Sequence, residues 1–309
     1  QHVSFSNCCL PYHLSGTVEN SDSLVLMTPE RFAKQYDIEA RVQSEVTAIY
    51  PKEKKVEVRD RQSGDTYEES YDKLILAPGA NPIMPKSITG IDKKHVFSVR
   101  NVTDIKALKQ YIDLNGITKA AVVGGGFIGV ETAENLKSAG LSVALVEGSS
   151  QIMMPFDYDM VQILHKEMMD CGVNLYLSSV LSEIKEDVIV IKRQEETETI
   201  EAEVVGMAIG VAPETGLAKA AGLGIGETGG ILVNKNHQTT DPDIYAVGDA
   251  VESFNRILGR PGRLALAGPA QRQARAAANH IYGEFDKNSG FLGSSCLRVF
   301  GQNAACTGI

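Results

Sequence analysis

A glycine-rich turn between a strand and a helix constrains the fold of this chain more than any other feature. Residues 124–129 read Gly-Gly-Gly-Phe-Ile-Gly and fit the pattern G-x-G-x-x-G. The apolar run 120–123 precedes them, a helical pattern over 127–139 follows, and the next apolar run, 142–146, ends in Glu147. A strand, a tight turn, a helix and a second strand ending in an acid are typical of a dinucleotide-binding β-α-β unit.

Each residue of this pattern has a physical role in that interpretation. Gly124 permits the tight turn, Gly126 lets backbone N–H groups approach a pyrophosphate, and Gly129 allows close contact between helix and strand. Glu147 would accept hydrogen bonds from ribose hydroxyls and repel a 2′-phosphate, which favours NAD(H) over NADP(H). The alternative interpretation is that the glycines only allow close packing within an ordinary α/β unit.

Length and composition narrow the class of protein. With 309 residues, of which 43% are hydrophobic and 22% charged, the chain is long enough for two α/β domains. The net charge of −9 argues against nucleic acid or an anionic membrane as a partner, because both require clustered Lys and Arg. No apolar run approaches the roughly 20 residues that span a bilayer. Five cysteines without a framework-like spacing indicate a reducing compartment, so we expect a cytoplasmic protein.

Periodicity and turn residues predict the remaining elements. Alternation over 40–49, 56–59 and 66–71 predicts a small antiparallel meander. The expected helices cover 101–114, 158–171 and 269–282, and a short one begins at Pro29. The expected strands are 24–28, 71–76, 174–177, 204–211, 231–233 and 244–247, two more within 184–200, and an alternating segment at 297–304.

Two further segments carry a resemblance to a known family. Residues 76–80 read Leu-Ala-Pro-Gly-Ala, and residues 239–250 end in Val-Gly-Asp-Ala. By physics alone, both are turns after short buried strands. They closely resemble the flavin motifs of the pyridine nucleotide-disulfide oxidoreductases, and with the Gly124 turn between them the resemblance covers nearly the whole chain. In that family the acid at Asp249 hydrogen-bonds the flavin ribitol, and Gly248 lets the backbone pass close to the cofactor.

The resemblance implies a fold and a set of cofactor contacts. The fold class is α/β, with two Rossmann-like dinucleotide-binding domains of three β/β/α layers, the NAD(H) domain being inserted into the FAD domain. The expected boundaries are 1–114 and 238–288 for the FAD domain, 115–237 for the NAD(H) domain, and 289–309 for the start of a C-terminal dimerisation domain. The residues expected to contact FAD or NAD(H) are Ala77, Pro78, Gly79, Gly124, Gly126, Gly129, Glu131, Glu147, Gly210, Gly248, Asp249, Pro269 and Ala270.

The family pattern extends beyond both ends of this chain. The N-terminal strand and glycine loop that hold the FAD adenosine should precede Cys8, and the dimerisation domain has barely begun at 290–309. We therefore expect an excerpt of a longer homodimeric protein, and we expect the intact protein, rather than the excerpt, to hold FAD well.

A cysteine near the start of the chain is the expected catalytic group. Residues 7–12 read Asn-Cys-Cys-Leu-Pro-Tyr, and a free cysteine in such a place is by itself most often a small buried hydrophobe. Within the family, this setting resembles the single-cysteine class, and most closely the coenzyme A-disulfide reductases and the NADH-dependent persulfide and polysulfide reductases. The resemblance aligns Cys8 with the redox-active cysteine, and Ser4 and Asn7 with residues that contact coenzyme A.

The implied chemistry runs from NADH through FAD to a mixed disulfide between Cys8 and a thiol such as coenzyme A. Cys8 must attack as a thiolate, so we expect a nearby flavin and helix N-terminus to lower its pKa. Glu131 is expected in the first turn of its helix, near the nicotinamide. A Cys8–Cys9 disulfide is an alternative state. The remaining cysteines are interpreted as packing residues: Cys171, Cys296 and Cys306.

Two other functions remain open. An NADH oxidase or peroxidase would cycle Cys8 through a sulfenic acid and consume oxygen or peroxide, but such enzymes typically follow the cysteine with Gly-Met rather than x-Leu-Pro-Tyr. A non-catalytic fragment would bind NAD(H) without flavin or turnover. The sequence singles out no metal ligands.

Overall fold

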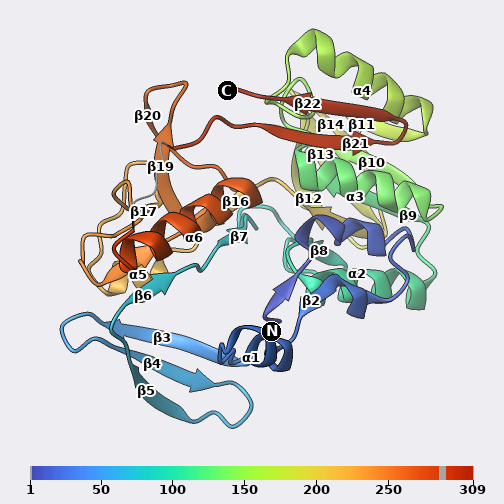
Figure 1. The fold of residues 1–309 in the computed structure, drawn as a ribbon. Coiled ribbons are helices and arrows are strands. Elements are labelled where there is room, and N and C mark those ends of the chain that lie inside the picture. Colours follow the sequence, from blue (N-terminus) through green and yellow to red (C-terminus); the bar gives the residue numbers. More distant parts are fainter. Residues whose placement is uncertain (1, 285–289, 309) are drawn as a thin grey trace.

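A five-stranded parallel sheet forms the centre of one half of the molecule (Figure 1). The structure, a computed structural model, describes residues 2–284 and 290–308. Both faces of the sheet are covered, which is why its strands are continuous apolar runs rather than alternating ones. In spatial order the strands are β11 (Val173–Tyr176), β10 (Ser142–Val146), β9 (Lys119–Val123), β15 (Val204–Met207) and β8 (Val96–Ser98).

Two different layers cover the two faces of this sheet. Successive residues of β9 point to opposite faces: Ala120 and Val122 pack in the core shared with the helices, whereas Ala121 and Val123 pack in the core shared with an antiparallel meander. The helices are α2 (Val102–Asn115), α3 (Phe127–Ser138) and α4 (Tyr158–Asp170). The meander is β12 (Val180–Ile184), β13 (Val188–Arg193) and β14 (Glu196–Glu201). The predicted β/β/α layering is therefore confirmed for this half.

The second half is assembled from segments on both sides of the first half in the sequence (Figure 1). A parallel pair, β6 and β18, lies at its centre, and a separate core holds it to the meander of β3, β4 and β5. Its strands are β3 (Ser44–Tyr50), β4 (Lys55–Asp60), β5 (Thr66–Ser70), β6 (Leu74–Leu76), β7 (Ala80–Pro82), β16 (Val211–Pro213), β17 (Ile231–Leu232), β18 (Ile244–Ala246), β19 (Val251–Asn255) and β20 (Arg260–Gly262). Its helices are α5 (Gly216–Ala220) and α6 (Ala267–Ile281).

The two ends of the described chain pack against the parallel-sheet half. The N-terminal end forms β1 (Ser4–Phe5), β2 (Val25–Met27) and α1 (Pro29–Tyr36), joined by single-turn 3₁₀ helices. The C-terminal end forms a hairpin of β21 (Ser295–Val299) and β22 (Gln302–Cys306), and β21 packs against both α3 and α4. Residues from both ends therefore reach the neighbourhood of α3.

Several predicted elements have different bounds in the structure. The strand expected over 204–211 is two strands in different sheets, because the backbone turns at Gly210, whose φ is +123°. The segment 40–43 lies outside β3, and β12 was not predicted. The alternating segment 297–304 reverses into a hairpin. The predicted boundary between 288 and 289 lies outside the described residues.

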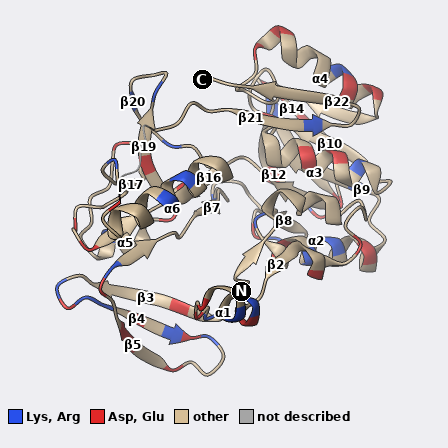
Figure 2. Cartoon of the chain, viewed as in Figure 1, with Lys and Arg blue, Asp and Glu red and all other residues tan. Residues whose placement is uncertain are grey.

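The surface carries charges of both signs. Acidic and basic residues are interspersed along both halves of the molecule (Figure 2). In the described part of the chain, no helix combines the length and the apolar character needed to cross a membrane.

We predict that Gly129→Ala destabilises the protein strongly while Gly126→Ala does not. A Cβ at Gly129 would lie 1.8 Å from the carbonyl oxygen of Gly124, so α3 would have to move away from β9, whereas a Cβ at Gly126 meets nothing within 4 Å. The expected loss in the free energy of unfolding is about 3 kcal/mol or more for Gly129→Ala. Urea denaturation of both variants measures it, and equal losses would contradict the close contact.

Candidate active site

The glycine turn leaves open space at the start of α3. Gly124 has φ +111°, and a Cβ there would lie 2.3 Å from the Ala208 carbonyl oxygen, so this turn is held tightly between β9 and β15. Gly126 is the N-cap of α3 and supplies no side-chain cap, and the space beside it is empty. The first N–H groups of α3 are thus available to an anion, which fits a pyrophosphate.

Glu147 lies beside this turn, directly after β10. One carboxylate oxygen accepts a hydrogen bond from the Gly125 N–H at 2.6 Å, and the other accepts one from the Ser149 N–H at 2.7 Å. A carboxylate accepts about four hydrogen bonds, so two remain for ribose hydroxyls. The backbone therefore fixes the Glu147 carboxylate beside the glycine turn.

The predicted flavin segments leave neighbouring strands at the same edge. β6 and β18 are parallel with Leu76 opposite Ala246, and the Val247 N–H donates to the Leu76 carbonyl at 2.9 Å. Because parallel strands end on the same side, the loop 77–79 and the turn Gly248-Asp249 emerge side by side. Two segments separated by about half of the chain are thus brought together.

The N-terminal part of α6 completes this group. The Gly248 N–H donates to the Gln273 side-chain oxygen at 2.7 Å, and a Cβ at Gly248 would lie 4.0 Å from the Ala270 Cβ. Pro269 precedes Ala270 in the first turn of α6. The residues predicted to hold FAD from this chain therefore surround one place.

Arg100 is a member of this group that the sequence did not indicate. It lies between β8 and α2, and its guanidinium donates to the Ala80 carbonyl at 2.6 Å. Burial raises the pKa of Asp249, and the charge of Arg100 opposes that rise. No local pattern marks Arg100, because its partners are distant in sequence.

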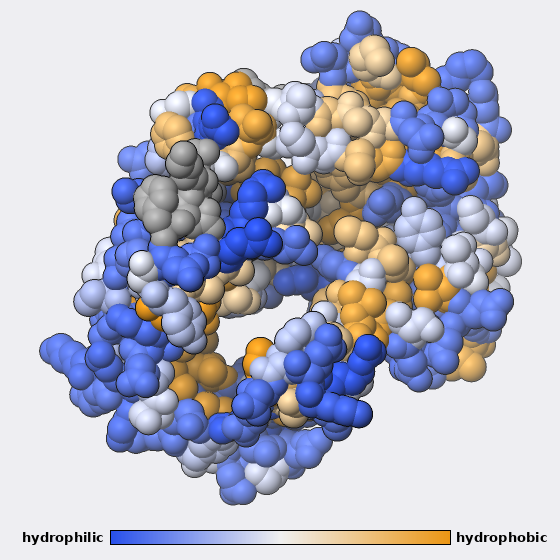
Figure 3. Space-filling view, viewed as in Figure 1, coloured by the Kyte–Doolittle hydropathy of each residue, from blue (hydrophilic) through white to orange (hydrophobic). Residues whose placement is uncertain are grey.

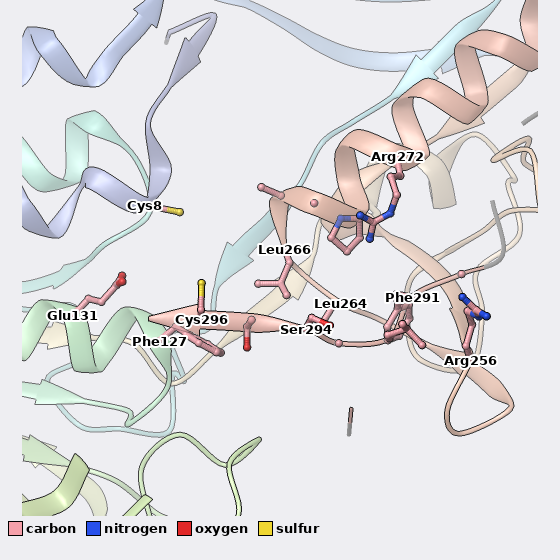
Figure 4. Close-up of a pocket in the computed structure, with 17 residues that line it drawn as sticks. Cys8, Phe127, Glu131, Arg256, Leu264, Leu266, Arg272, Phe291, Ser294 and Cys296 are labelled. Carbon is pink, nitrogen blue, oxygen red and sulfur yellow. The ribbon is translucent and has the colours of Figure 1, made fainter. Parts of the chain in front are cut away.

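A cavity of about 670 Å³ lies between α3 and α6 (Figure 4), and of the residues predicted to contact a cofactor it is lined by Glu131 and Pro269. Phe127 and Glu131 from α3 form one wall, Pro269 from α6 forms another, and Cys8 points into it. The space-filling view shows the molecule hollowed between its halves, with apolar side chains along parts of the hollow (Figure 3). The glycine-turn helix, the flavin-type helix and the predicted catalytic thiol therefore meet at one place.

Cys8 is presented to this cavity by a single turn of 3₁₀ helix, Asn7–Cys9. Leu10 and Leu14 follow it and are each only 1% exposed, so they anchor the turn in the core beneath α2 and α3 while the Cys8 side chain stays exposed. The other predicted substrate residues are nearby in sequence but do not line the cavity. Ser4 lies in β1 opposite Met27, and Asn7 is exposed.

The protein groups around Cys8 raise its pKa, so the lowering that we expected from a helix N-terminus is not found. Although the Cys8 side chain is exposed, partial loss of solvent around its sulfur is the largest cause, followed by the negative charges of Glu131 and Cys9, and a backbone hydrogen bond only partly opposes them. A single 3₁₀ turn supplies too small a dipole to offset a neighbouring carboxylate. The protein's own groups therefore favour the thiol over the thiolate.

Glu131 has a raised pKa of its own. It lies in the second turn of α3 rather than the predicted first, where it is partly buried. Burial and the nearby charge of Glu134 raise its pKa to about 7. Glu131 can therefore hold or release a proton beside Cys8 near neutral pH.

The remaining predicted residues have simple placements. Gly210 lies between β15 and β16, and its carbonyl accepts the Ile83 N–H at 3.0 Å. All five cysteines are free, so Cys8 and Cys9 are not joined. Cys9 and Cys306 pack against the helix-side core, but Cys296 is exposed in the cavity, so the packing prediction is wrong for Cys296. Among the described residues, no group of three His, Cys, Asp or Glu side chains is arranged to hold a metal ion.

Comparison with known proteins identifies the family. The model of the pyridine nucleotide-disulphide oxidoreductase family matches residues 1–274. Coenzyme A disulfide reductase of Staphylococcus haemolyticus is 33% identical over 312 residues, covering 99% of this chain and 68% of that protein. NADH oxidase of Methanocaldococcus jannaschii is 35% identical over 312 residues, covering 100% of this chain and 68% of that protein. The chain therefore belongs to the pyridine nucleotide-disulphide oxidoreductases.

A solved structure supports the fold at higher identity. Reduced CoADR-RHD of Bacillus anthracis has a TM-score of 0.96 and 40% identity, covering 100% of this chain and 56% of that chain. The predicted family and α/β fold class are confirmed. The chain spans about two thirds of the length of the two curated relatives and just over half of the B. anthracis chain.

We predict that Glu131→Gln raises stability more at high pH than at low pH. In the folded protein the pKa of Glu131 is about 7, above the ordinary value of 4.5. The free energy of unfolding of the wild type therefore falls as the pH rises from 4.5 to about 7, and it stays lowered at higher pH. The variant lacks this loss. Urea denaturation at about pH 5 and about pH 8 measures the difference. Glu195→Gln, in the exposed turn between β13 and β14, is the surface control, and an equal change for that variant would contradict the prediction.

We also predict that Glu131→Gln lets Cys8 react faster with iodoacetamide near neutral pH. Removing the carboxylate removes a cause of the raised Cys8 pKa and so increases the thiolate fraction. Mass spectrometry of the Cys8 peptide gives the rate from about pH 6 to about pH 10. An unchanged pH midpoint would show that the two side chains do not interact.

Proposed function

We propose that this chain is the cofactor-binding and catalytic part of an FAD-dependent NAD(P)H oxidoreductase that reduces a disulfide, persulfide or polysulfide, such as that of coenzyme A. The observation that carries the proposal is the single cavity that brings Cys8 together with α3 and α6. We further propose that the intact protein is a cytoplasmic homodimer. The domain boundaries predicted at residues 114, 237 and 288 belong to this proposal.

Separate sets of residues would bind the two cofactors, NAD(H) and FAD. Gly124, Gly126 and Gly129 would receive the NAD(H) pyrophosphate, and Glu147 its ribose, which favours NADH over NADPH. The residues that would hold the flavin are Ala77, Pro78, Gly79, Gly248, Asp249, Pro269 and Ala270, and Gly210 would contact one of the two cofactors. Bound FAD would supply two-electron transfer between NADH and the thiol site.

Cys8 would carry the sulfur chemistry. Its thiolate attacks one sulfur of the substrate and forms a mixed disulfide, and the other half leaves as a thiolate. Because the protein raises the pKa of Cys8, this attack requires removal of a proton, and Glu131 is close enough to influence that step. Ser4 and Asn7 would contact a thiol such as coenzyme A outside the cavity.

The choice of sulfur substrates rests on the segment after the thiol. Leu10-Pro11-Tyr12 is the pattern of coenzyme A-disulfide and persulfide reductases, and the Staphylococcus haemolyticus relative carries the first of these names. The Methanocaldococcus jannaschii relative supports a second candidate, an NADH oxidase in which Cys8 becomes a sulfenic acid. A non-catalytic NAD(H)-binding fragment is the third candidate, and such a protein would be colourless.

We predict that Cys8→Ser in the full-length protein abolishes reduction of coenzyme A disulfide and polysulfide but leaves reduction of the flavin by NADH intact. The reason is that the thiol acts only after electrons reach the flavin. Absorbance of the yellow flavin follows the first step, and release of thiol follows the second. Cys171→Ser, at the C-cap of α4, is the matched control and should retain both steps.

Three results would contradict the proposal. Full disulfide reduction by the Cys8 variant would assign the chemistry to another thiol, first of all Cys9. NADH oxidation matched by oxygen or peroxide consumption, and unaffected by disulfides, would establish the oxidase. Absence of flavin from the purified full-length protein would favour the fragment.

A further inference from the structure

A buried histidine of α4, His165, contacts the loop that packs against the glycine turn. Its Nε2 atom accepts a hydrogen bond from the backbone N–H of Ile152 at 3.2 Å, and the residue is 5% exposed. We propose that His165 is a positioning residue for NAD(H) binding: it holds Ile152, and with it the loop 148–157, against Gly125 of the glycine turn. This inference rests on the proposed function, because it takes NAD(H) to bind at that turn.

The loop is joined to the glycine turn by the residue that follows Ile152. The Met153 N–H donates to the Gly125 carbonyl oxygen at 2.7 Å, and the N–H of the same glycine donates to the Glu147 carboxylate at 2.6 Å. Both backbone polar groups of Gly125 are therefore bonded to residues that follow β10.

The bond from Met153 also fixes the direction of a neighbouring N–H group. The Gly125 carbonyl and the Gly126 N–H belong to one peptide unit, which is planar and trans, so they point in opposite directions. With the carbonyl directed at the loop, the Gly126 N–H is directed away from it. This N–H lies at the start of α3, among the groups that would receive a pyrophosphate.

The loop depends on its neighbours to keep this conformation. Met153 has φ +49°, in the left-handed region that residues other than glycine rarely adopt. Both Ile152 and Met153 are buried in the helix-side core. A Cβ at Gly125 would lie 2.8 Å from the Ile152 Cγ2 atom, so the Ile152 side chain occupies the space that a side chain at Gly125 would need.

The hydrogen bonds of His165 determine which ring nitrogen carries its proton. The Nδ1 atom lies 3.2 Å from the side-chain oxygen of Gln162, whose amide nitrogen donates to the Tyr158 carbonyl at 2.9 Å. Nδ1 therefore donates to the Gln162 oxygen, and Nε2 is left as the acceptor for Ile152. Burial lowers the pKa of His165, which favours the neutral ring that this arrangement requires.

Removing the acceptor would leave a donor unpaired in the core. The Ile152 N–H would then lack a hydrogen bond at a buried position, and it could regain one only if the loop moved toward water. Such a movement would draw Met153 away from Gly125, because Ile152 and Met153 are consecutive. His165 thus acts on the nucleotide-binding turn through two residues of the loop.

Two substitutions separate the hydrogen bond from the packing of the side chain. His165→Gln brings a side-chain oxygen near the position of Nε2 and can still accept from Ile152, whereas His165→Leu is of similar size and has no acceptor. In the full-length protein, calorimetric titration with NAD⁺ should give a dissociation constant about tenfold higher for His165→Leu and within about twofold of the wild type for His165→Gln. Leu164→Ala is the matched control for destabilisation of α4, since it removes buried volume but no acceptor, and it should bind NAD⁺ like the wild type.

Hydrogen exchange in the absence of nucleotide provides a second measurement. In His165→Leu, mass spectrometry of peptides covering the loop 148–157 should show faster exchange at the Ile152 and Met153 amides, and His165→Gln should exchange like the wild type. Equal exchange in these three proteins would overturn the proposal, and so would equal affinity for NAD⁺. An equal loss of affinity in Leu164→Ala would also overturn it, because general destabilisation of α4 would then explain the effect.

Failure of the proposed function gives a different result. A wild-type protein that does not bind NAD⁺ would overturn the proposed function, and this inference with it. Binding of NAD⁺ by the wild type without any loss in His165→Leu would overturn the role of His165 alone.

Discussion

The contact between α3 and β9 is the constraint on which the rest of this structure depends. Gly129 and Gly124 approach so closely that no side chain fits between helix and strand. That contact sets the direction of α3, and α3 in turn supports β10, the segment after Cys8, and β21. A helix packed farther from the sheet would displace the open turn at Gly126, the Glu131 carboxyl and both cavity thiols together.

The protein groups that surround the cavity oppose ionisation of Cys8, which the proposed chemistry requires. Glu131 and Glu134 are partly buried acids on one helix, and the first of them faces the thiol that must ionise. Because its pKa is about 7, Glu131 is part protonated and part ionised near neutral pH. Its charge therefore responds to the ionisation of its neighbours. The site therefore couples protonation of a carboxyl group to that of a thiol through burial and charge alone.

The features that could be predicted are those encoded within short stretches or in a family pattern. The Gly124 turn and Glu147 are a local strand-turn-helix-strand unit, and the structure places them side by side as expected. The loops at Ala77 and Asp249 were found by resemblance, and the parallel pairing of β6 with β18 explains why they lie side by side. The end of β15 before Gly210 was not predicted, because the apolar residues on both sides of Gly210 continue the strand pattern.

The sequence by itself determined the family and the α/β class and indicated Cys8 as the expected redox-active cysteine, because these features are encoded in residues close together in the chain. Only the tertiary structure decided that Arg100 accompanies Asp249, that Cys8 has a raised pKa, and that Cys296 faces the cavity. The physical reason is the same in each case. Burial, charge and access of a side chain depend on elements that folding brings together across the chain, and no local pattern records them.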